Sequence, residues 1–133
     1  MRDARELRGR TVRNDRQVSI VAVEELGQIA GPLGVPEIKP TWLGVNLALS
    51  GLADLSRQPA GTRLVFPEGP ELEIEAIINP CTAPGKVIES HFEGRAGLAS
   101  DFPKAAEGLR GVVASVRRGG DIRAGDPVRV FLP

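Results

Sequence analysis

Cys81 is the residue with the clearest chemical potential, because it is the only cysteine among the 133 residues. It lies in segment 78–85 between two prolines, whose rings restrict the backbone. A thiol acts as a nucleophile, sulfur carrier or soft metal ligand only as its thiolate, and nearby positive potential favours that form. Thr82 can cap a helix that begins here, and Lys86 lies one turn into that helix. The alternative is that Cys81 is a small, buried and inert side chain.

Two other polar residues are candidates for the same chemistry. His91 shares a helical stripe with three apolar residues, so it is either a base for Cys81 or a packed side chain with one hydrogen bond. Asn46 lies in the mostly apolar segment 42–51, where an unpaired buried amide costs about 1–3 kcal/mol. We therefore expect Asn46 either to lock a turn through its side chain or to contact a ligand.

The composition excludes several classes of function. Seventeen basic and seventeen acidic side chains give a formal net charge of zero, so no global field attracts nucleic acid or an anionic membrane. Aromatic residues make up 4% of the chain, which is few for a surface that stacks single-stranded nucleic acid. One histidine and one cysteine cannot build a Cys/His zinc cluster within a single chain.

The cysteine count and the distribution of apolar residues indicate the cellular location of the protein. A single cysteine cannot form an internal disulfide, and no charged-then-apolar leader opens the chain. No apolar run approaches the length of about 20 residues that spans a bilayer. We therefore expect a cytoplasmic protein with no membrane partner.

A hairpin is the clearest structural pattern, and it leads directly to Cys81. Its arms are residues 62–66 and 71–78, which flank a turn rich in proline and glycine. In the second arm, glutamates alternate with apolar residues, which predicts a strand with one solvated face rather than a metal or acid–base site. The buried face is predicted to comprise Leu72, Ile74 and Ala76.

The remaining patterns predict short strands and a few short helices. Short strands joined by Gly/Pro turns indicate a mainly β, α+β fold, either a barrel or a curled mixed sheet. Strands are predicted at 17–23, 111–116 and 126–132, helices at 24–30, 85–92 and 101–108, and connections at 52–60 and 117–125. Gly31 and Pro32 are expected to end the first helix.

The first sixteen residues have little apolar surface to bury. Six of them are arginine and three are acidic. Since such a composition cannot offset its ordering entropy, we expect residues 1–16 to form a solvated, arginine-rich lead-in to a single domain at 17–133. The alternative is that these arginines bind phosphate.

The order of several segments resembles the MOSC domain, the family named for the C-terminal domain of molybdenum-cofactor sulfurases. The resemblance runs from about residue 17 to the C-terminus. The matching segments are 17–26, 44–51, 61–64, 79–81, 110–114 and 119–128.

This resemblance implies a MOSC-like β-barrel and a molybdenum cofactor (molybdopterin). It implies that Cys81 carries sulfur as a persulfide or ligates molybdenum, and both roles use a soft, deprotonated sulfur. It also implies that Asn46, Lys86 and Arg110 help to bind the pterin and its phosphate, since a guanidinium donates two parallel hydrogen bonds to phosphate.

Three functions are compatible with the resemblance. The first is a stand-alone domain that binds the cofactor or carries sulfur through Cys81. The second is a molybdenum-dependent reductase of N-hydroxylated compounds, which needs an electron-donor reductase as a partner. The third is a shortened, non-catalytic relative. Family members usually have a longer N-terminal portion, and large sulfurases add a pyridoxal-phosphate-dependent desulfurase, so we expect this chain to take sulfur from a separate donor such as a cysteine desulfurase.

Overall fold

A computed structural model describes residues 2–7 and 9–133. Within these residues, short strands alternate with short helices, as expected for a mainly β, α+β fold. The strands are β1 (Arg2–Glu6), β2 (Arg10–Val12), β3 (Gln17–Ala22), β4 (Leu47–Ser50), β5 (Arg63–Val65), β6 (Glu71–Ile77), β7 (Val112–Arg118), β8 (Gly120–Ile122) and β9 (Pro127–Phe131). The helices are α1 (Val23–Leu33), α2 (Thr82–Ser90) and α3 (Leu98–Ala106), with two 3-10 turns, η1 (Pro40–Leu43) and η2 (Leu55–Arg57).

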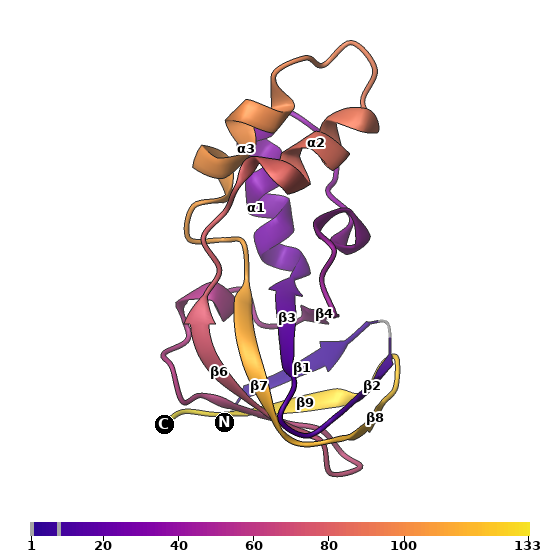
Figure 1. Cartoon of the computed structure of the whole chain (residues 1–133), viewed down its shortest axis with the longest axis vertical. Helices are drawn as coiled ribbons and strands as arrows, with labels where there is room; N and C mark the ends of the chain where they lie inside the picture. The colour runs from indigo at the N-terminus through magenta and orange to yellow at the C-terminus, as the bar shows by residue number, and fades with distance from the viewer. Residues whose placement is uncertain (1, 8) are drawn as a thin grey trace.

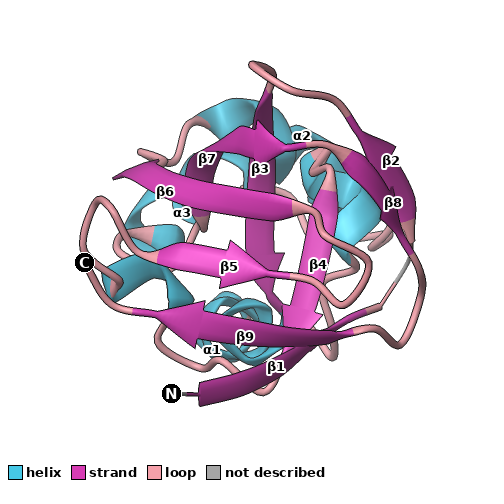
Figure 2. Ribbon diagram, turned by 90° about the horizontal axis from the view of Figure 1, so that it is seen from below, coloured by secondary structure: helices cyan, strands magenta, loops and turns pink. Residues whose placement is uncertain are grey.

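The strands of the described residues build a closed barrel and a small separate sheet. The barrel order is β1-β4-β3-β7-β6-β5-β9, and pairing between β1 and β9 closes it. Strands β3 and β4 are parallel, whereas the other barrel pairs are antiparallel. Strands β2 and β8 pair with each other. The helices stack on one end of the barrel (Figure 1), and the barrel strands lie in front of them in Figure 2. The predicted β-barrel is confirmed.

The barrel and the helical layer have separate apolar cores, and β3 contributes to both. Ile20 and Ala22 lie in the barrel core, whereas Val21 between them belongs to the core beneath the helices. Because successive side chains of a strand point to opposite faces, a strand buried on both sides is a continuous apolar run. This explains the apolar sequence at 17–23.

The expectation of a solvated lead-in is wrong for the described residues at the N-terminus. Residues 2–6 form β1, which lies between β9 and β4 and completes the barrel. Ala4 is 3% exposed, and β2 pairs with β8 inside the segment 117–125 that we predicted to be only a connection. The composition did not reveal these strands because their backbone hydrogen bonds are satisfied by strands more than 100 positions away in the sequence, β9 for β1 and β8 for β2.

The predicted hairpin is confirmed, because β5 and β6 pair antiparallel. The glutamates of β6 lie on its outer face, where Glu73 accepts a hydrogen bond from Arg117 at 2.9 Å. The prediction is wrong at Ala76, which is exposed rather than buried. A register shift between Ile74 and Ala76 interrupts the alternation there.

All three helices have other bounds than predicted, and α2 runs from Thr82 to Ser90 rather than over 85–92. Helix α1 continues through Pro32 and is capped by Gly34, which adopts the left-handed conformation with φ 70°. Pro32 has no N–H to donate to the preceding turn, and the helix ends one residue later, at Leu33. Helix α3 begins at Leu98 rather than at Asp101. No helix among the described residues has the length and apolar character needed to cross a membrane.

Candidate functional site

Cys81 lies at the junction between the barrel and the helical layer. It follows the last residues of β6 and occupies the N-cap position of α2, in an extended conformation. Helix α2 therefore begins at Thr82, immediately after the thiol, which places Cys81 at the positive end of the helix. The side chain is exposed, so the alternative of a buried Cys81 is wrong.

An open pocket of about 340 Å³ includes Cys81. One wall comes from η1 and the glycine after it, and the opposite wall comes from the first turns of α2. Apart from Cys81 and Arg110, its lining is mainly apolar: Trp42, Leu43, Gly44, Ala83, Pro84 and Val87. The pocket thus presents one thiol and one cation in apolar surroundings.

Arg110 is the buried cation of this pocket, with 9% of its surface exposed. Its Nη2 donates a hydrogen bond to the backbone oxygen of Leu43 at 3.2 Å. Its Nη1 is buried and has no hydrogen-bond partner among the described residues. Burial lowers the pKa of Arg110, and the charge of Cys81 acts in the opposite direction. No carboxylate of the described residues pairs with this guanidinium, which therefore favours a bound anion in the pocket.

A buried hydrogen-bond chain holds the backbone next to Arg110. The N–H of Gly111 donates to Ser56 Oγ at 2.9 Å, and Ser56 Oγ donates to the Glu25 carboxylate at 2.8 Å. The backbone N–H of Ser56 donates to the same carboxylate at 3.0 Å. Glu25 is 1% exposed and Ser56 is 4% exposed. Desolvation raises the pKa of Glu25, although the hydrogen bonds from Ser56 oppose this increase.

Gly111 also anchors the segment that leads to Cys81. Its carbonyl oxygen accepts a hydrogen bond from the N–H of Ile78 at 2.9 Å. Its φ is 104°, and a Cβ on this residue would lie 2.1 Å from the backbone oxygen of Ile20. Only glycine fits here, so one tightly packed residue positions both Arg110 and the approach to Cys81.

Asn46 makes a structural contact, but it does not lock a turn as predicted, because its partner Ser19 lies 27 residues away on β3. Its Oδ1 accepts hydrogen bonds from the backbone N–H and the hydroxyl of Ser19, at 2.8 and 3.3 Å. Its own N–H donates to Ser19 Oγ at 3.1 Å. These bonds link the segment before β4 to β3. Asn46 does not line the Cys81 pocket but a neighbouring one.

Lys86 and His91 also lie outside the pocket lining. Lys86 is exposed on α2. The His91 ring stacks on the indole of Trp42, with centroids 4.2 Å apart and an interplanar angle of 14°. His91 therefore contacts a residue of the pocket wall, not the thiol side of the pocket. Of the predicted site residues, the structure brings together Cys81 and Arg110.

The site residues that the sequence did not indicate are Glu25, Ser56 and Trp42. Glu25 lies in the first turn of α1, where acidic residues are common, so its sequence position does not reveal this contact. Nothing in the spacing of Glu25, Ser56 and Gly111 signals that they meet. Their contacts depend on η2 packing against α1 and on the chain returning to β7.

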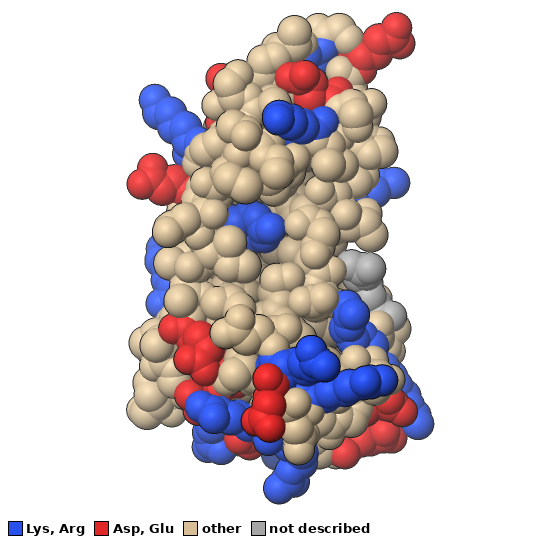
Figure 3. Space-filling view, viewed as in Figure 1, with Lys and Arg blue, Asp and Glu red and all other residues tan. Residues whose placement is uncertain are grey.

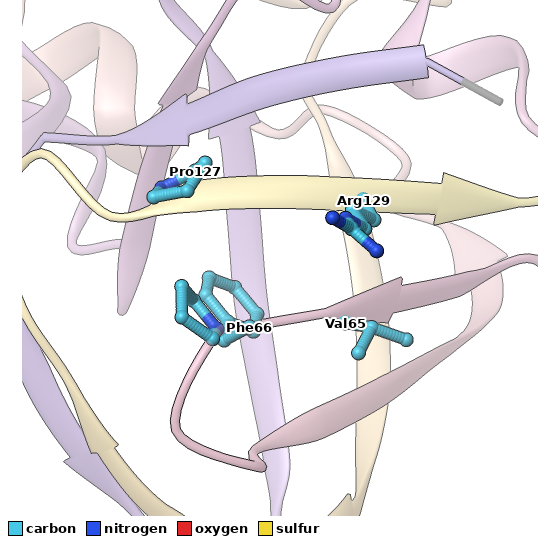
Figure 4. Close-up of a pocket in the computed structure, with 5 residues that line it drawn as sticks. Val65, Phe66, Pro127 and Arg129 are labelled. Atoms are coloured by element: carbon cyan, nitrogen blue, oxygen red, sulfur yellow. The ribbon is translucent and has the colours of Figure 1, made fainter.

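A separate pocket of about 400 Å³ lies between β5 and β9 (Figure 4). Val65, Phe66, Pro127 and Arg129 line it, and none of the predicted site residues does. Figure 2, which views the molecule from below, shows these two strands in front of the helices. The chemistry expected of a thiol belongs to the Cys81 pocket and not to this one.

The described residues offer few ligands for a metal ion. No group of three or more His, Cys, Asp or Glu side chains suited to a metal ion occurs in the described part of the chain. Cys81 can supply one soft ligand, and Arg110 can offset the charge of an anionic complex. The residues therefore fit a metal complex in which most of the metal ligands come from the cofactor and not from the protein.

The fold and the site define a class: small β-barrel domains in which one exposed thiol shares a pocket with a buried cation. The chain belongs to the MOSC domain family, whose model matches residues 8–129. This confirms the resemblance seen in the sequence.

The relatives support the same assignment. YuaD of Bacillus subtilis (strain 168), which is named for metal-sulfur cluster biosynthesis, is 45% identical over 123 residues. That match covers 92% of this chain and 64% of YuaD, so the chain spans less than two thirds of its relative. A crystal structure of the Bacillus subtilis YuaD protein has a TM-score of 0.84 at 44% identity, covering 90% of this chain and 65% of that one. YiiM from Geobacillus stearothermophilus, at 18% identity, a TM-score of 0.72 and coverage of 92% and 60%, shares the fold.

Proposed function

We propose that this MOSC domain carries sulfur through Cys81 for the assembly of metal–sulfur centres. The observation that carries the proposal is the exposed Cys81 thiol in one pocket with the buried guanidinium of Arg110. A sulfur carrier needs a reachable thiol that reacts as an anion. Arg110 supplies a cation in the same pocket. The name of the relative YuaD, which refers to metal-sulfur cluster biosynthesis, supports a role in sulfur transfer.

The sulfur-transfer step uses the Cys81 thiolate as the nucleophile. It attacks the terminal sulfur of a persulfide on a donor such as a cysteine desulfurase, forming a new S–S bond on Cys81. The S–S bond of the donor breaks, and the donor thiol leaves as a thiolate with the electron pair. The transferred sulfur keeps its oxidation state, so no additional oxidant is required. Arg110 attracts the negative charge that Cys81 bears before and after the transfer.

Binding of a molybdenum cofactor uses the same two residues. Cys81 would ligate the metal, and Arg110 would offset the anionic charge of the complex. When bound, the cofactor would supply a redox-active metal centre. The exposure of Cys81 and the unpartnered Nη1 of Arg110 support this fit. Reduction of N-hydroxylated compounds stays a prediction, to be tested with the cofactor-loaded chain and a working electron donor.

The test is to load the full chain with sulfur and weigh the intact protein. With a cysteine desulfurase and cysteine, the wild type should gain the mass of one sulfur atom, which a reducing thiol removes. Cys81→Ser should gain nothing, and Arg110→Gln should load more slowly. Lys86→Gln is the matched control, since it removes an exposed cation outside the pocket.

Two results would defeat the proposal. One is Cys81→Ser accepting sulfur as well as the wild type. The other is a wild type that gains no sulfur from the desulfurase or from polysulfide. Cofactor binding is measured separately, by the fluorescence of the oxidised pterin released from each variant.

A further inference from the structure

A pocket of about 260 Å³ opens where the turn from β2 to β3 meets the segment before β4. Its charged lining residues are Arg10, Arg13 and Arg16, and no carboxylate lines it. None of these arginines forms an ion pair with a carboxylate of the described residues. Figure 3 shows several basic side chains over the area of β2, with acidic side chains beside them. Because the chain has no net charge, this positive potential is local.

The turn that presents these arginines is fixed by backbone hydrogen bonds. The N–H of Asp15 donates to the oxygen of Val116 at 3.0 Å, and the N–H of Val116 donates to the oxygen of Arg16 at 2.8 Å. The N–H of Arg16 donates to the oxygen of Arg13 at 3.2 Å. The backbone carrying two of the arginines is therefore pinned to β7, which reduces the ordering entropy that a ligand must offset.

Asn46 adds a neutral donor to the pocket. Its Oδ1 is occupied by the N–H and the hydroxyl of Ser19. The amide group Nδ2 is thus the part of the side chain left to interact with a ligand. Three arginines and Asn46 thus line one pocket, together with the apolar residues Val12 and Val18.

We propose that this arginine pocket, defined by Arg10, Arg13, Arg16 and Asn46, binds a phosphate-class oxyanion. Guanidinium groups hold such anions through paired, charge-assisted hydrogen bonds. No carboxylate lines the pocket, and the nearby carboxylate of Asp121 accepts a hydrogen bond from the Thr11 hydroxyl at 2.6 Å. The ligand is a free phosphate or the phosphate of a larger molecule. The chemistry of recognition is the same in both cases.

The arginine pocket is close to the Cys81 pocket but independent of its thiol. Gly44 lines the Cys81 pocket and Asn46 lines the arginine pocket. Two residues span at most about 7 Å, so the two pockets adjoin along the chain. The oxyanion site nevertheless involves no sulfur chemistry, and it can exist whether or not Cys81 carries sulfur.

The experiment is a titration of the full chain with inorganic phosphate and with pyrophosphate, followed by amide chemical shifts in NMR. We expect saturable shifts confined to residues 10–18 and to Asn46. Arg13→Gln and Arg16→Gln should each weaken phosphate binding by about tenfold, as expected for the loss of hydrogen bonds to a charged group. Arg129→Gln, an equal change of charge at an exposed site on β9, should leave the affinity unchanged.

The outcomes separate this proposal from the proposed function. Cys81→Ser should bind phosphate like the wild type, even if it loses sulfur loading. Shifts that spread over the surface without saturation, or an equal loss of affinity in Arg13→Gln and Arg129→Gln, would overturn the oxyanion site. A simple phosphate monoester distinguishes the two sources of the ligand. Affinity equal to that of inorganic phosphate supports a free anion, and tighter binding supports the phosphate of a larger molecule.

Discussion

The carboxylate of Glu25 accepts hydrogen bonds from both the hydroxyl and the backbone N–H of Ser56, at 2.8 and 3.0 Å, in the interior of the protein. This pair joins α1 to η2. Through the hydrogen bond from Gly111 to Ser56 Oγ, it also supports the backbone next to Arg110. A charge on Glu25 is therefore linked to the stability of the region that positions the candidate site.

Replacement of Glu25 by Gln should change how stability depends on pH. Burial raises the pKa of Glu25 above its ordinary value of 4.5, so the folded state binds the proton more tightly than the unfolded state. Below pH 4.5 this contribution is fully present, and it is lost as the pH rises through the folded pKa. The unfolding free energy of the wild type, relative to Glu25→Gln, should therefore decrease from acid to neutral pH.

Urea denaturation of both proteins across this pH range measures the difference. Glu37→Gln, at an exposed position, is the control and should show a constant difference from the wild type. If the gap between the wild type and Glu25→Gln were also constant with pH, Glu25 would not titrate differently in the folded and unfolded states.

Replacement of Arg110 by Gln should alter the charge preference of Cys81 alkylation. The guanidinium favours an anionic reagent in the pocket, so the rate with iodoacetate relative to iodoacetamide should fall by roughly fivefold in Arg110→Gln. The ratio cancels changes in general accessibility of the thiol. Lys86→Gln should change the ratio much less, because Lys86 is exposed and outside the pocket lining. Equal ratios in the wild type and Arg110→Gln would mean that Arg110 does not act on reagents at the thiol.

Replacement of Gly111 by Ala should be strongly destabilising. The new Cβ would lie 2.1 Å from the backbone oxygen of Ile20 and would also require a left-handed φ of 104°. We expect a loss of more than about 3 kcal/mol in unfolding free energy, since strain and displacement of backbone add. The matched variant Gly125→Ala, with φ 87° and open space around the Cβ, should lose only about 1–2 kcal/mol. Thermal and urea unfolding of both variants check this, and similar losses would show that the contact with Ile20 can relax.

Local patterns were sufficient for the parts of the fold that depend on neighbouring residues. The alternation at 71–78 predicted β6, and the prolines on either side of Cys81 marked the region where α2 begins, although Cys81 and not Thr82 is the N-cap residue. Both rest on backbone preferences and on a period of two, which a short segment carries by itself. The cysteine at this junction was therefore placed correctly, and the order of short segments was enough to indicate the family.

Contacts between distant segments required the tertiary structure. The arginine-rich residues at 2–6 are polar along the chain, yet they form β1 because β9 and β4 offer backbone partners far away in sequence. Arg110 was named through the resemblance, but its burial beside Cys81 depends on how η1 and α2 pack. The chain from Glu25 through Ser56 to Gly111 was not foreseen at all.

The sequence by itself determined the local elements, the lack of net charge and the single thiol at the end of a hairpin. Only the tertiary structure decided that this thiol is exposed, that Arg110 is the buried cation next to it, and that three arginines share one pocket. The physical reason is that periodicity and turn residues act over a few positions, whereas burial, charge pairing and barrel closure depend on which distant segments meet.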